Sequence, residues 1–180
     1  VNSDYFDYVI QAKDVKHYVT DKITNMLYTP FTKTIFLDTD TIVCRNVEEL
    51  FLLLDRFEIA AAMDGRGGWY PSECSSFFPE LNTGVIVYKN NPLVFEMLTL
   101  WNNIYAYQVN SDINPPHDQP SFRDAVYRSG VQFATLSYEY NLRTIFPMII
   151  SRCIKPAILH GRNVIHSDFL YFLGCVDEPR

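Results

Sequence analysis

The chain has 180 residues, of which 48% are hydrophobic and 20% are charged, a composition typical of a folded globular domain with a substantial core. Its formal net charge is −6 and it has no cluster of lysine and arginine, which argues against a nucleic-acid partner, because phosphate backbones require clustered cations. No apolar run reaches the length of about 18 residues that a membrane span needs. None of the four cysteines forms a CxxC pair, which argues against a zinc knuckle.

Short apolar runs alternate with helical patterns along the chain, which predicts an α/β fold. The first predicted elements are a strand over Phe6–Ile10, a helix over Asp21–Tyr28 and a strand over Thr34–Leu37. The last of these is a short apolar run with polar neighbours, which is typical of a buried parallel strand. Asn46 followed by Glu49 resembles a capping box and predicts a helix that ends near Leu54.

The next predicted strand, Glu58–Met63, is followed by a long irregular stretch over Asp64–Leu81 that is rich in Gly, Pro, Ser and aromatic residues. Loops of this length in compact domains are usually functional, so we expect this stretch to contribute to a site. Asn91 and Pro92 then begin a long helix, since Asn is a good cap and Pro suits the first turn. Its apolar positions recur with helical spacing at Val94, Met97, Leu98, Trp101, Ile104 and Tyr105. The remaining predicted elements are a strand over Gly84–Tyr88, a helix over Asp118–Arg128, and strands over Val131–Leu136 and Ala157–His160.

The clearest chemical motif is Asp38-Thr39-Asp40, which directly follows a buried apolar strand. Ligands of open α/β sheets collect at the carboxyl ends of strands, so both acids fall where a site is expected. Two carboxylates this close repel each other unless a cation lies between them. A divalent ion with oxygen ligands, Mn²⁺ or Mg²⁺, meets this need and commonly also binds substrate phosphates. The motif therefore predicts a metal site for a phosphate-bearing substrate.

The same motif also resembles the nucleophile segment of haloacid-dehalogenase-like phosphatases. In that alternative, Asp38 attacks a phosphoryl group and Asp40 acts as acid and base. The alternative requires a later pair of acids at a strand end, and no convincing pair follows residue 64. The motif also usually opens its domain, whereas a predicted strand and helix come first here.

From Lys22 to Arg162 the chain resembles the nucleotide-diphospho-sugar transferases of GT-A fold, near the glycogenin-like and lipopolysaccharide galactosyltransferase-like (family 8-like) enzymes. Five segments carry the resemblance and occur in the family's order. They are Lys22, the FLDTDTIV segment with the following NVEELF, the ELNTGVIVY segment (Glu80–Tyr88), His117-Asp118-Gln119, and Ile158-Leu159-His160-Gly161-Arg162.

The resemblance implies a mixed, mainly parallel sheet flanked by helices. It implies transfer of a sugar from a nucleoside diphosphate sugar, with UDP expected, to a carbohydrate or other hydroxyl acceptor, with a retaining outcome. Three sets of residues would carry this activity. The implied metal ligands are Asp38, Asp40 and His160; the implied donor-binding residues are Lys22, Asp38, Thr39, Asp40, Gly161 and Arg162; and the implied catalytic and sugar-orienting residues are Asn82, Asp118 and Gln119. Asp64, with Trp69 and Tyr70 in the long loop, is expected to meet the acceptor, since aromatic faces stack on sugar rings.

Several of these residues also have a purely structural explanation. Lys22 could be a solvated helix residue, Asp118 could be a helix cap, and His160 could be a satisfied core histidine. The family's fold normally begins with a strand that carries base-binding residues, and nothing before Phe6 supplies one. We therefore expect residues 1–180 to be a single domain that begins within the nucleotide-binding half. A catalytically incomplete fragment that binds sugar without transferring it is the corresponding alternative.

Overall fold

The computed structural model describes residues 6–12, 15, 19–65, 74–75, 77–111, 117–143 and 155–161. Its helices are α1 (Val19–Met26), α2 (Leu50–Leu53), α3 (Pro92–Asn110) and α4 (Gln119–Ser129), with a 3₁₀ helix η2 (Tyr138–Asn141). Its strands are β1 (Lys33–Leu37), β2 (Thr41–Val43), β3 (Ile59–Met63), β4 (Leu81–Lys89), β5 (Phe133–Leu136), β6 (Leu142–Arg143) and β7 (Ile158–His160). Within these ranges, none of the helices combines the length and the apolar character that crossing a membrane would need.

The described strands form two mixed sheets, one of order β1-β4-β3-β5 and one of order β2-β7-β6. The mixed, helix-flanked α/β architecture confirms the predicted fold class. The expectation of mainly parallel pairing is wrong for the described strands, because three of their five pairings are antiparallel. The chain passes from β3 to β4 without a described helix between them and returns antiparallel. The parallel pair β3 and β5 is instead separated by α3 and α4, which supply the crossover that parallel strands require.

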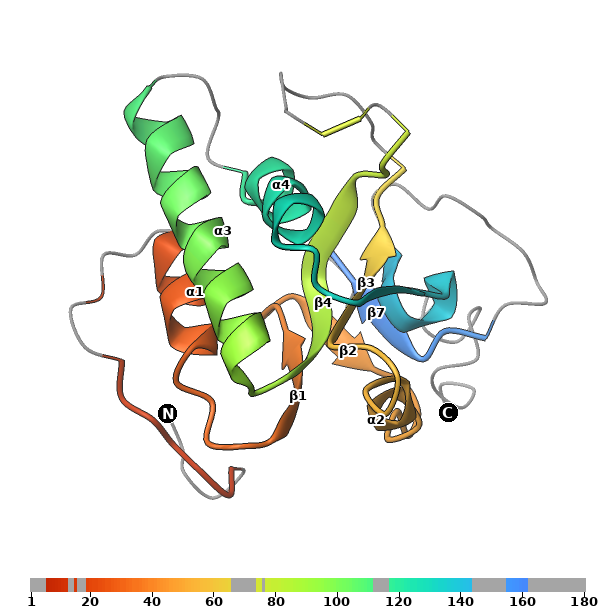
Figure 1. Ribbon diagram of the computed structural model, residues 1–180. Helices are drawn as coiled ribbons and strands as arrows, with labels where there is room; N and C mark the ends of the chain where they lie inside the picture. Colours follow the sequence, from red (N-terminus) through yellow and green to blue (C-terminus); the bar gives the residue numbers. More distant parts are fainter. Residues whose placement is uncertain are drawn as a thin grey trace.

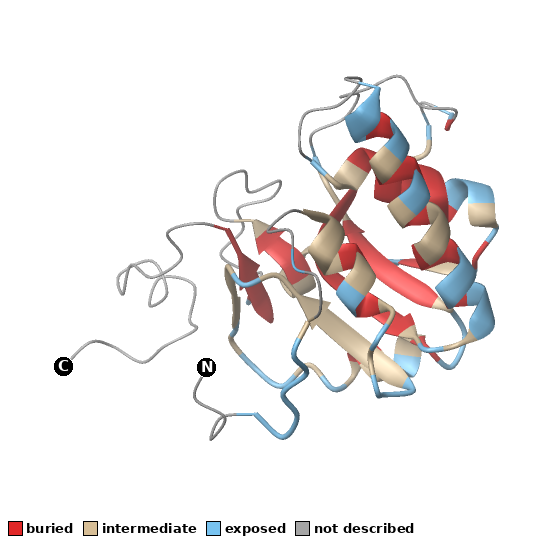
Figure 2. Cartoon of the chain, turned by 90° about the vertical axis from the view of Figure 1, so that its left-hand side faces the viewer, coloured by how far each residue is buried: buried red, intermediate tan, exposed pale blue. Residues whose placement is uncertain are grey.

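The four-stranded sheet is the middle of three layers (Figure 1). Helices α1, α3 and α4 cover one face, and α2 and the three-stranded sheet cover the other. Side chains of β3 alternate between these layers: Ile59 and Ala61 pack with α1, α3 and α4, whereas Ala60 and Ala62 pack with α2. In Figure 2 the buried stripes of the helices face the buried strands. The central strands are apolar on both sides because both of their faces are covered.

Helix α3 forms as its sequence predicts. The side chain of Asn91 accepts a hydrogen bond from the backbone N–H of Val94 at 3.0 Å, and Pro92 is the first helical residue. Every residue of the predicted apolar face is buried. Trp101 of this face packs against Phe122 of α4 with ring centroids 4.7 Å apart, which joins the two helices over the sheet.

Three local predictions are wrong. Residues 6–10 are described, and they are exposed and form no strand. Strand β1 is a half-buried edge strand that pairs antiparallel with β4, not a buried parallel strand. Helix α2 begins only at Leu50, because Asn46 accepts from the backbone N–H of Glu48 at 2.8 Å and so closes a turn. Glu49 does not complete a capping box; its carboxylate instead contacts Arg45 and Tyr140.

Candidate functional site

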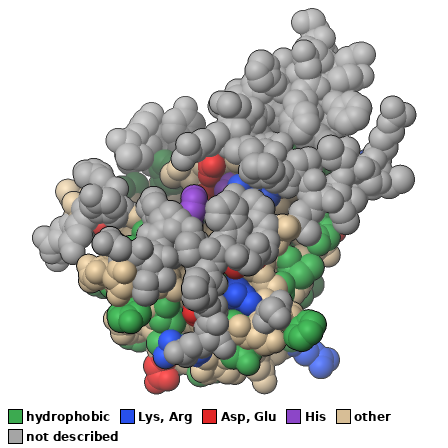
Figure 3. Space-filling model, turned by 90° about the horizontal axis from the view of Figure 1, so that it is seen from above, with side chains coloured by type: hydrophobic (Ala, Val, Ile, Leu, Met, Phe, Trp, Pro, Cys, Tyr) green, Lys and Arg blue, Asp and Glu red, His purple; other side chains and the backbone are tan. Residues whose placement is uncertain are grey.

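Ionisable side chains gather where β1 and β3 end and β4 begins. Figure 3 looks onto the molecule from above and shows histidine lying beside acidic and basic side chains on this face. Asp38 directly follows β1, and Thr39 and Asp40 form a turn that leads into β2. Thr41 holds this turn, since its backbone N–H and its hydroxyl donate to the carbonyl of Asp38 at 3.2 and 2.8 Å. The turn therefore carries the chain from the four-stranded sheet to the three-stranded sheet, with one carboxylate on each side.

His160 reaches this turn because β7 pairs antiparallel with β2, with His160 opposite Thr41. The next residue, Gly161, donates its backbone N–H to the carbonyl of Asp40 at 2.9 Å. Gly161 has a φ of 138°, which favours glycine because it has no Cβ. Strand pairing and this backbone bond together hold the imidazole beside the two acids.

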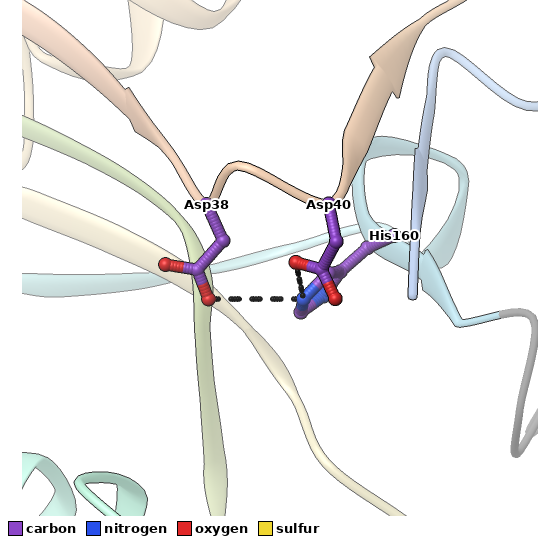
Figure 4. Close-up of side chains that lie close together, drawn as sticks. All are labelled: Asp38, Asp40 and His160. Atoms are coloured by element: carbon purple, nitrogen blue, oxygen red, sulfur yellow. Dashed lines mark ion pairs between the residues drawn. The ribbon is translucent and has the colours of Figure 1, made fainter. Parts of the chain in front are cut away.

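The side chains of Asp38, Asp40 and His160 point toward one another (Figure 4), and one ligand atom from each lies within 4.8 Å of the other two. Nε2 of His160 lies 3.4 Å from Oδ1 of Asp40 and 3.8 Å from Oδ2 of Asp38. Two carboxylate oxygens and one imidazole nitrogen are a donor set that fits a divalent cation.

The protonation of His160 suits this role. Burial lowers its pKa from the ordinary value of 6.5, and the positive charge of Arg143 lowers it further, against the opposing effects of Asp40 and Asp38. The imidazole is therefore neutral near pH 7, and the close approaches to the two carboxylates are not salt bridges. A neutral ring leaves one nitrogen lone pair available for a metal.

Lys22 of α1 is not a solvated helix residue, since its side chain is only 15% exposed. Its ammonium lies 3.0 Å from Oδ1 of Asp38 and 3.0 Å from Oδ2 of Asp118, and donates to the carbonyl of Thr83 at 2.7 Å. Asp118 stands at the N-cap position of α4, but among the described residues its side chain makes no capping hydrogen bond. The carboxylates of Asp38, Asp40 and Asp118 outnumber the single ammonium of Lys22, so the cluster can accept further positive charge.

A second group of polar side chains surrounds Asp64, whose side chain is only 4% exposed. Its Oδ2 accepts from Nε2 of Gln119 at 2.8 Å, from Nδ2 of Asn82 at 3.2 Å and from Arg143 at 3.2 Å. Nδ2 of Asn82 also lies 3.2 Å from Oε1 of Gln119. The structure thus brings Asn82 and Gln119, which the sequence predicts to orient a sugar, into one hydrogen-bonded group.

Gly84 explains why this segment reads Asn-x-Gly. Its backbone N–H donates to Oδ1 of Asn82 at 2.9 Å, and its carbonyl accepts from the N–H of Asp38 at 2.8 Å. A Cβ at this position would lie 2.0 Å from Cε1 of His160. The absence of a side chain therefore makes room for the imidazole, while the backbone connects Asn82 to the acidic turn.

The predicted site residues fall into three groups by their placement. Eight lie in these two clusters, namely Lys22, Asp38, Asp40, Asp64, Asn82, Asp118, Gln119 and His160. Thr39 is exposed on the turn, and Gly161 contributes its backbone. Arg162, Trp69 and Tyr70 lie outside the described residues.

Sequence reasoning missed Asn141 and Arg143. Asn141 lies against the ring of His160, and Arg143 lies against Asp64. The polar-apolar-polar order Asn141-Leu142-Arg143 could have indicated a short strand with two polar side chains on one face.

No protein-family model matches the sequence, and no match was found among curated proteins. Solved structures do share its fold. Mouse xyloside xylosyltransferase 1 is 18% identical with a TM-score of 0.53, and the alignment covers 81% of this chain and 63% of that one. The galactosyltransferase LgtC, in complex with donor and acceptor sugar analogs, is 15% identical with a TM-score of 0.51, covering 94% and 72%. The glycosyltransferase GlyE of Streptococcus pneumoniae is 20% identical with a TM-score of 0.53, covering 78% and 36%.

The chain therefore has the GT-A glycosyltransferase fold, as the sequence resemblance implied. It spans 63% of the length of the mouse xylosyltransferase and 36% of the pneumococcal enzyme. Within this fold, Asp38, Asp40 and His160 form a group of side chains that could hold a metal ion.

Proposed function

We propose that the chain carries the donor-binding and catalytic site of a metal-dependent glycosyltransferase, which moves a sugar from a nucleoside diphosphate sugar to a hydroxyl acceptor. UDP is the proposed nucleotide, and the proposed outcome is retention at the anomeric carbon. The single observation that carries the proposal is the convergence of Asp38, Asp40 and His160 within a fold shared with glycosyltransferases. Asp38 and Asp40 flank the turn between the two sheets, and His160 joins them from β7, which is far from this turn in the sequence.

The proposed metal is Mn²⁺ in preference to Mg²⁺, because Mg²⁺ prefers oxygen ligands and this set includes a nitrogen. When bound, such an ion neutralises charge on the leaving diphosphate. Thr39 and the backbone of Gly161 lie beside the proposed ligands and are proposed to bind the donor. Arg162 is proposed to bind the donor phosphates as a second cationic side chain.

Lys22 is proposed to stabilise the negative charge that develops on the leaving group. Its ammonium already contacts Asp38, a proposed metal ligand, and Asp118, a proposed sugar-contacting residue. Lys22 therefore lies between the proposed metal site and the proposed sugar-binding residues. Asn82, Asp118 and Gln119 are proposed to orient the donor sugar, and Asp64 with Trp69 and Tyr70 to face the acceptor.

The test is release of UDP from a panel of UDP-sugars with Mn²⁺, in the presence of sugar acceptors and compared with EDTA. We expect turnover that depends on the metal and falls by at least about a hundredfold in Asp40→Asn, because the amide weakens metal binding and cannot offset its charge. The matched control is Asp55→Asn, which removes an exposed carboxylate that pairs with Lys33 on the surface. Anomeric NMR of the product distinguishes retention from inversion.

A parallel assay with para-nitrophenyl phosphate and Mg²⁺ tests the phosphatase alternative. Release of nitrophenol that is lost in Asp38→Asn, without turnover of any UDP-sugar, would replace the proposal with a phosphoryl-transfer function. A folded chain that binds Mn²⁺ and UDP-sugar but turns over neither substrate would favour the sugar-binding alternative.

A further inference from the structure

A line of buried and partly buried hydrogen bonds connects Asp64 to His160 through two asparagines. Asn82 donates from Nδ2 to Oδ2 of Asp64 at 3.2 Å, and Asn141 donates from Nδ2 to Oδ1 of Asn82 at 2.9 Å. Oδ1 of Asn141 then lies 2.9 Å from Nδ1 of His160. Asn82, Asn141 and His160 are 1%, 3% and 6% exposed, so water cannot readily substitute for a broken link in this line.

The orientation of the first amide is determined at both of its ends. Gly84 offers Asn82 a backbone N–H, which can only donate, and this N–H lies 2.9 Å from Oδ1. Asp64 offers a carboxylate, which when ionised can only accept, and Arg143 lies beside it at 3.2 Å. A flipped Asn82 amide would face both groups with the wrong atom. Its oxygen must therefore point toward Gly84 and Asn141.

The orientation of the second amide follows from the first. Because Asn82 presents an oxygen to Asn141, Asn141 must present its NH₂ in return. The oxygen of Asn141 then faces the imidazole, and an amide oxygen can only accept a hydrogen bond. Nδ1 of a neutral His160 must therefore carry the ring proton. Its lone pair is on Nε2, the atom that lies 3.4 Å from Asp40 and 3.8 Å from Asp38.

We propose that Asn141 is a positioning residue that holds His160 in the Nδ1–H tautomer, so that Nε2 is the ligand nitrogen that faces Asp38 and Asp40. The tautomer itself is a property of the metal-free chain; its use in metal binding rests on the proposed function. Histidines that bind metals commonly have such a partner on the second nitrogen, and loss of that partner weakens metal binding about 10- to 100-fold.

Asn141 is also connected to the Asp64 side of the site, through Arg143 in the same short segment of the chain. Arg143 is two residues further along, and the two side chains contact His160 and Asp64 respectively, while Leu142 between them is buried. Strand β6 also pairs with β7, with Arg143 beside His160 in the register. One three-residue segment thus contacts both the metal-ligand side and the Asp64 side of the site.

The direct test is the tautomer of His160 in the metal-free, ¹⁵N-labelled chain near pH 8, where an ordinary imidazole is neutral. Long-range ¹H–¹⁵N correlation distinguishes the protonated from the unprotonated ring nitrogen, and His160→Gln assigns the signal. We expect Nδ1–H in the wild type. Nε2–H in the wild type would overturn the proposal whatever any variant does.

Two substitutions then separate the two hydrogen bonds of Asn141. Asn141→Leu removes both, so we expect mixed or Nε2–H tautomers and a Kd for Mn²⁺, measured by calorimetry, that rises about 10- to 100-fold. Asn141→Asp keeps an acceptor for Nδ1–H and loses the NH₂, so we expect the wild-type tautomer and most of the Mn²⁺ affinity. Gln108→Leu, which removes another buried amide on α3, is the matched control and should leave both readouts unchanged.

Three results would overturn the proposal: Asn141→Leu with unchanged tautomer and affinity, Asn141→Asp with a lost Nδ1–H, or Gln108→Leu with the same effects as Asn141→Leu. If Asn141→Leu does not fold, the wild-type spectrum and Asn141→Asp still decide. The proposed function can fail separately. Absence of sugar transfer with the expected tautomers and Mn²⁺ affinities would refute the transferase activity and leave the role of Asn141 intact.

Discussion

The two sheets of this protein differ in what they contribute. The four-stranded sheet has a core on each face, and its strand β4 has eight buried residues in succession. The three-stranded sheet consists of strands of two or three residues, and among the described residues its own cluster has two buried members, Leu142 and Leu159. The proposed metal ligands lie where the two sheets meet: Asp38 follows β1 of the large sheet, Asp40 directly precedes β2 of the small sheet, and His160 ends β7 of the small sheet.

The large sheet and the small sheet therefore have different roles: one stabilises the fold and the other positions His160. Apolar burial contributes free energy in proportion to area, so most of the folding stability should come from the four-stranded sheet and its helices. The small sheet adds little burial, but it brings His160 to the acidic turn. Substitutions in the two sheets should therefore affect stability and metal binding to different degrees.

The largest expected effect is on the core of the four-stranded sheet. Phe122→Ala removes a fully buried ring that packs against Trp101, and we expect the free energy of unfolding to fall by about 3–5 kcal/mol. Leu142→Ala, in the small sheet, should cost about 2 kcal/mol but should weaken Mn²⁺ binding more than a core substitution of equal cost. Urea unfolding and Mn²⁺ calorimetry measure both quantities. Equal ratios of stability loss to affinity loss in the two variants would contradict the comparison.

The next effect concerns the contact between the sheets. Gly84→Ala places a Cβ 2.0 Å from the imidazole of His160, so the ring must move. We expect a loss of about 1–3 kcal/mol in unfolding free energy, typical of overpacking, and loss of Mn²⁺ binding. The matched control is Gly130→Ala, where φ is +66° but no atom lies within 4 Å of the new Cβ. It should cost about 1 kcal/mol and leave Mn²⁺ binding intact. Normal Mn²⁺ affinity in Gly84→Ala would show that His160 does not need this close approach.

The third effect is a dependence on pH. The pKa of His160 in the folded chain lies below 6.5, so below pH 6.5 the unfolded chain binds more protons at this residue than the folded chain does. Its contribution to stability is therefore present above about pH 6.5 and is lost as the pH falls through the folded pKa. Protons also compete with the metal for Nε2, so Mn²⁺ affinity should fall in the same range.

Arg143→Gln sharpens this prediction. It removes the positive charge that helps to lower the pKa of His160, so the pKa measured by NMR titration should rise. Arg128→Gln, at the exposed end of α4, is the control and should not move it. An unchanged or lowered pKa in Arg143→Gln would contradict the electrostatic explanation.

The smallest effect is expected at the surface. Arg45 pairs with Glu49 and stacks over Tyr140 of η2, with its side chain 42% exposed. Such exposed pairs contribute at most about 1 kcal/mol, so Arg45→Gln should change the unfolding free energy by no more than this and leave Mn²⁺ affinity unchanged. A larger loss in urea unfolding would mean that this contact holds η2, and with it Asn141, in place.

Local sequence determined much of this protein. The spacing of apolar residues specified α3 and its buried face, because a helix that covers a sheet must present one apolar stripe. The apolar runs specified β3 and β4, and the acidic pair after β1 indicated a cation site. The same reasoning failed over residues 6–10, where an apolar run has no neighbouring strand in the described structure. It also failed at Glu49, because Arg45, four residues earlier, and Tyr140, distant in the sequence, compete with the helix N-terminus for its carboxylate.

Only the tertiary structure decided how the site is assembled. Nothing local in the sequence reveals that Gly84 must lack a side chain, because the atom it avoids belongs to His160, on another strand. Nor does local pattern reveal Asn141, whose two partners, Asn82 and His160, are distant in the sequence. The physical reason is that periodicity reports which face of an element is buried, whereas hydrogen-bond direction and close packing depend on which elements meet.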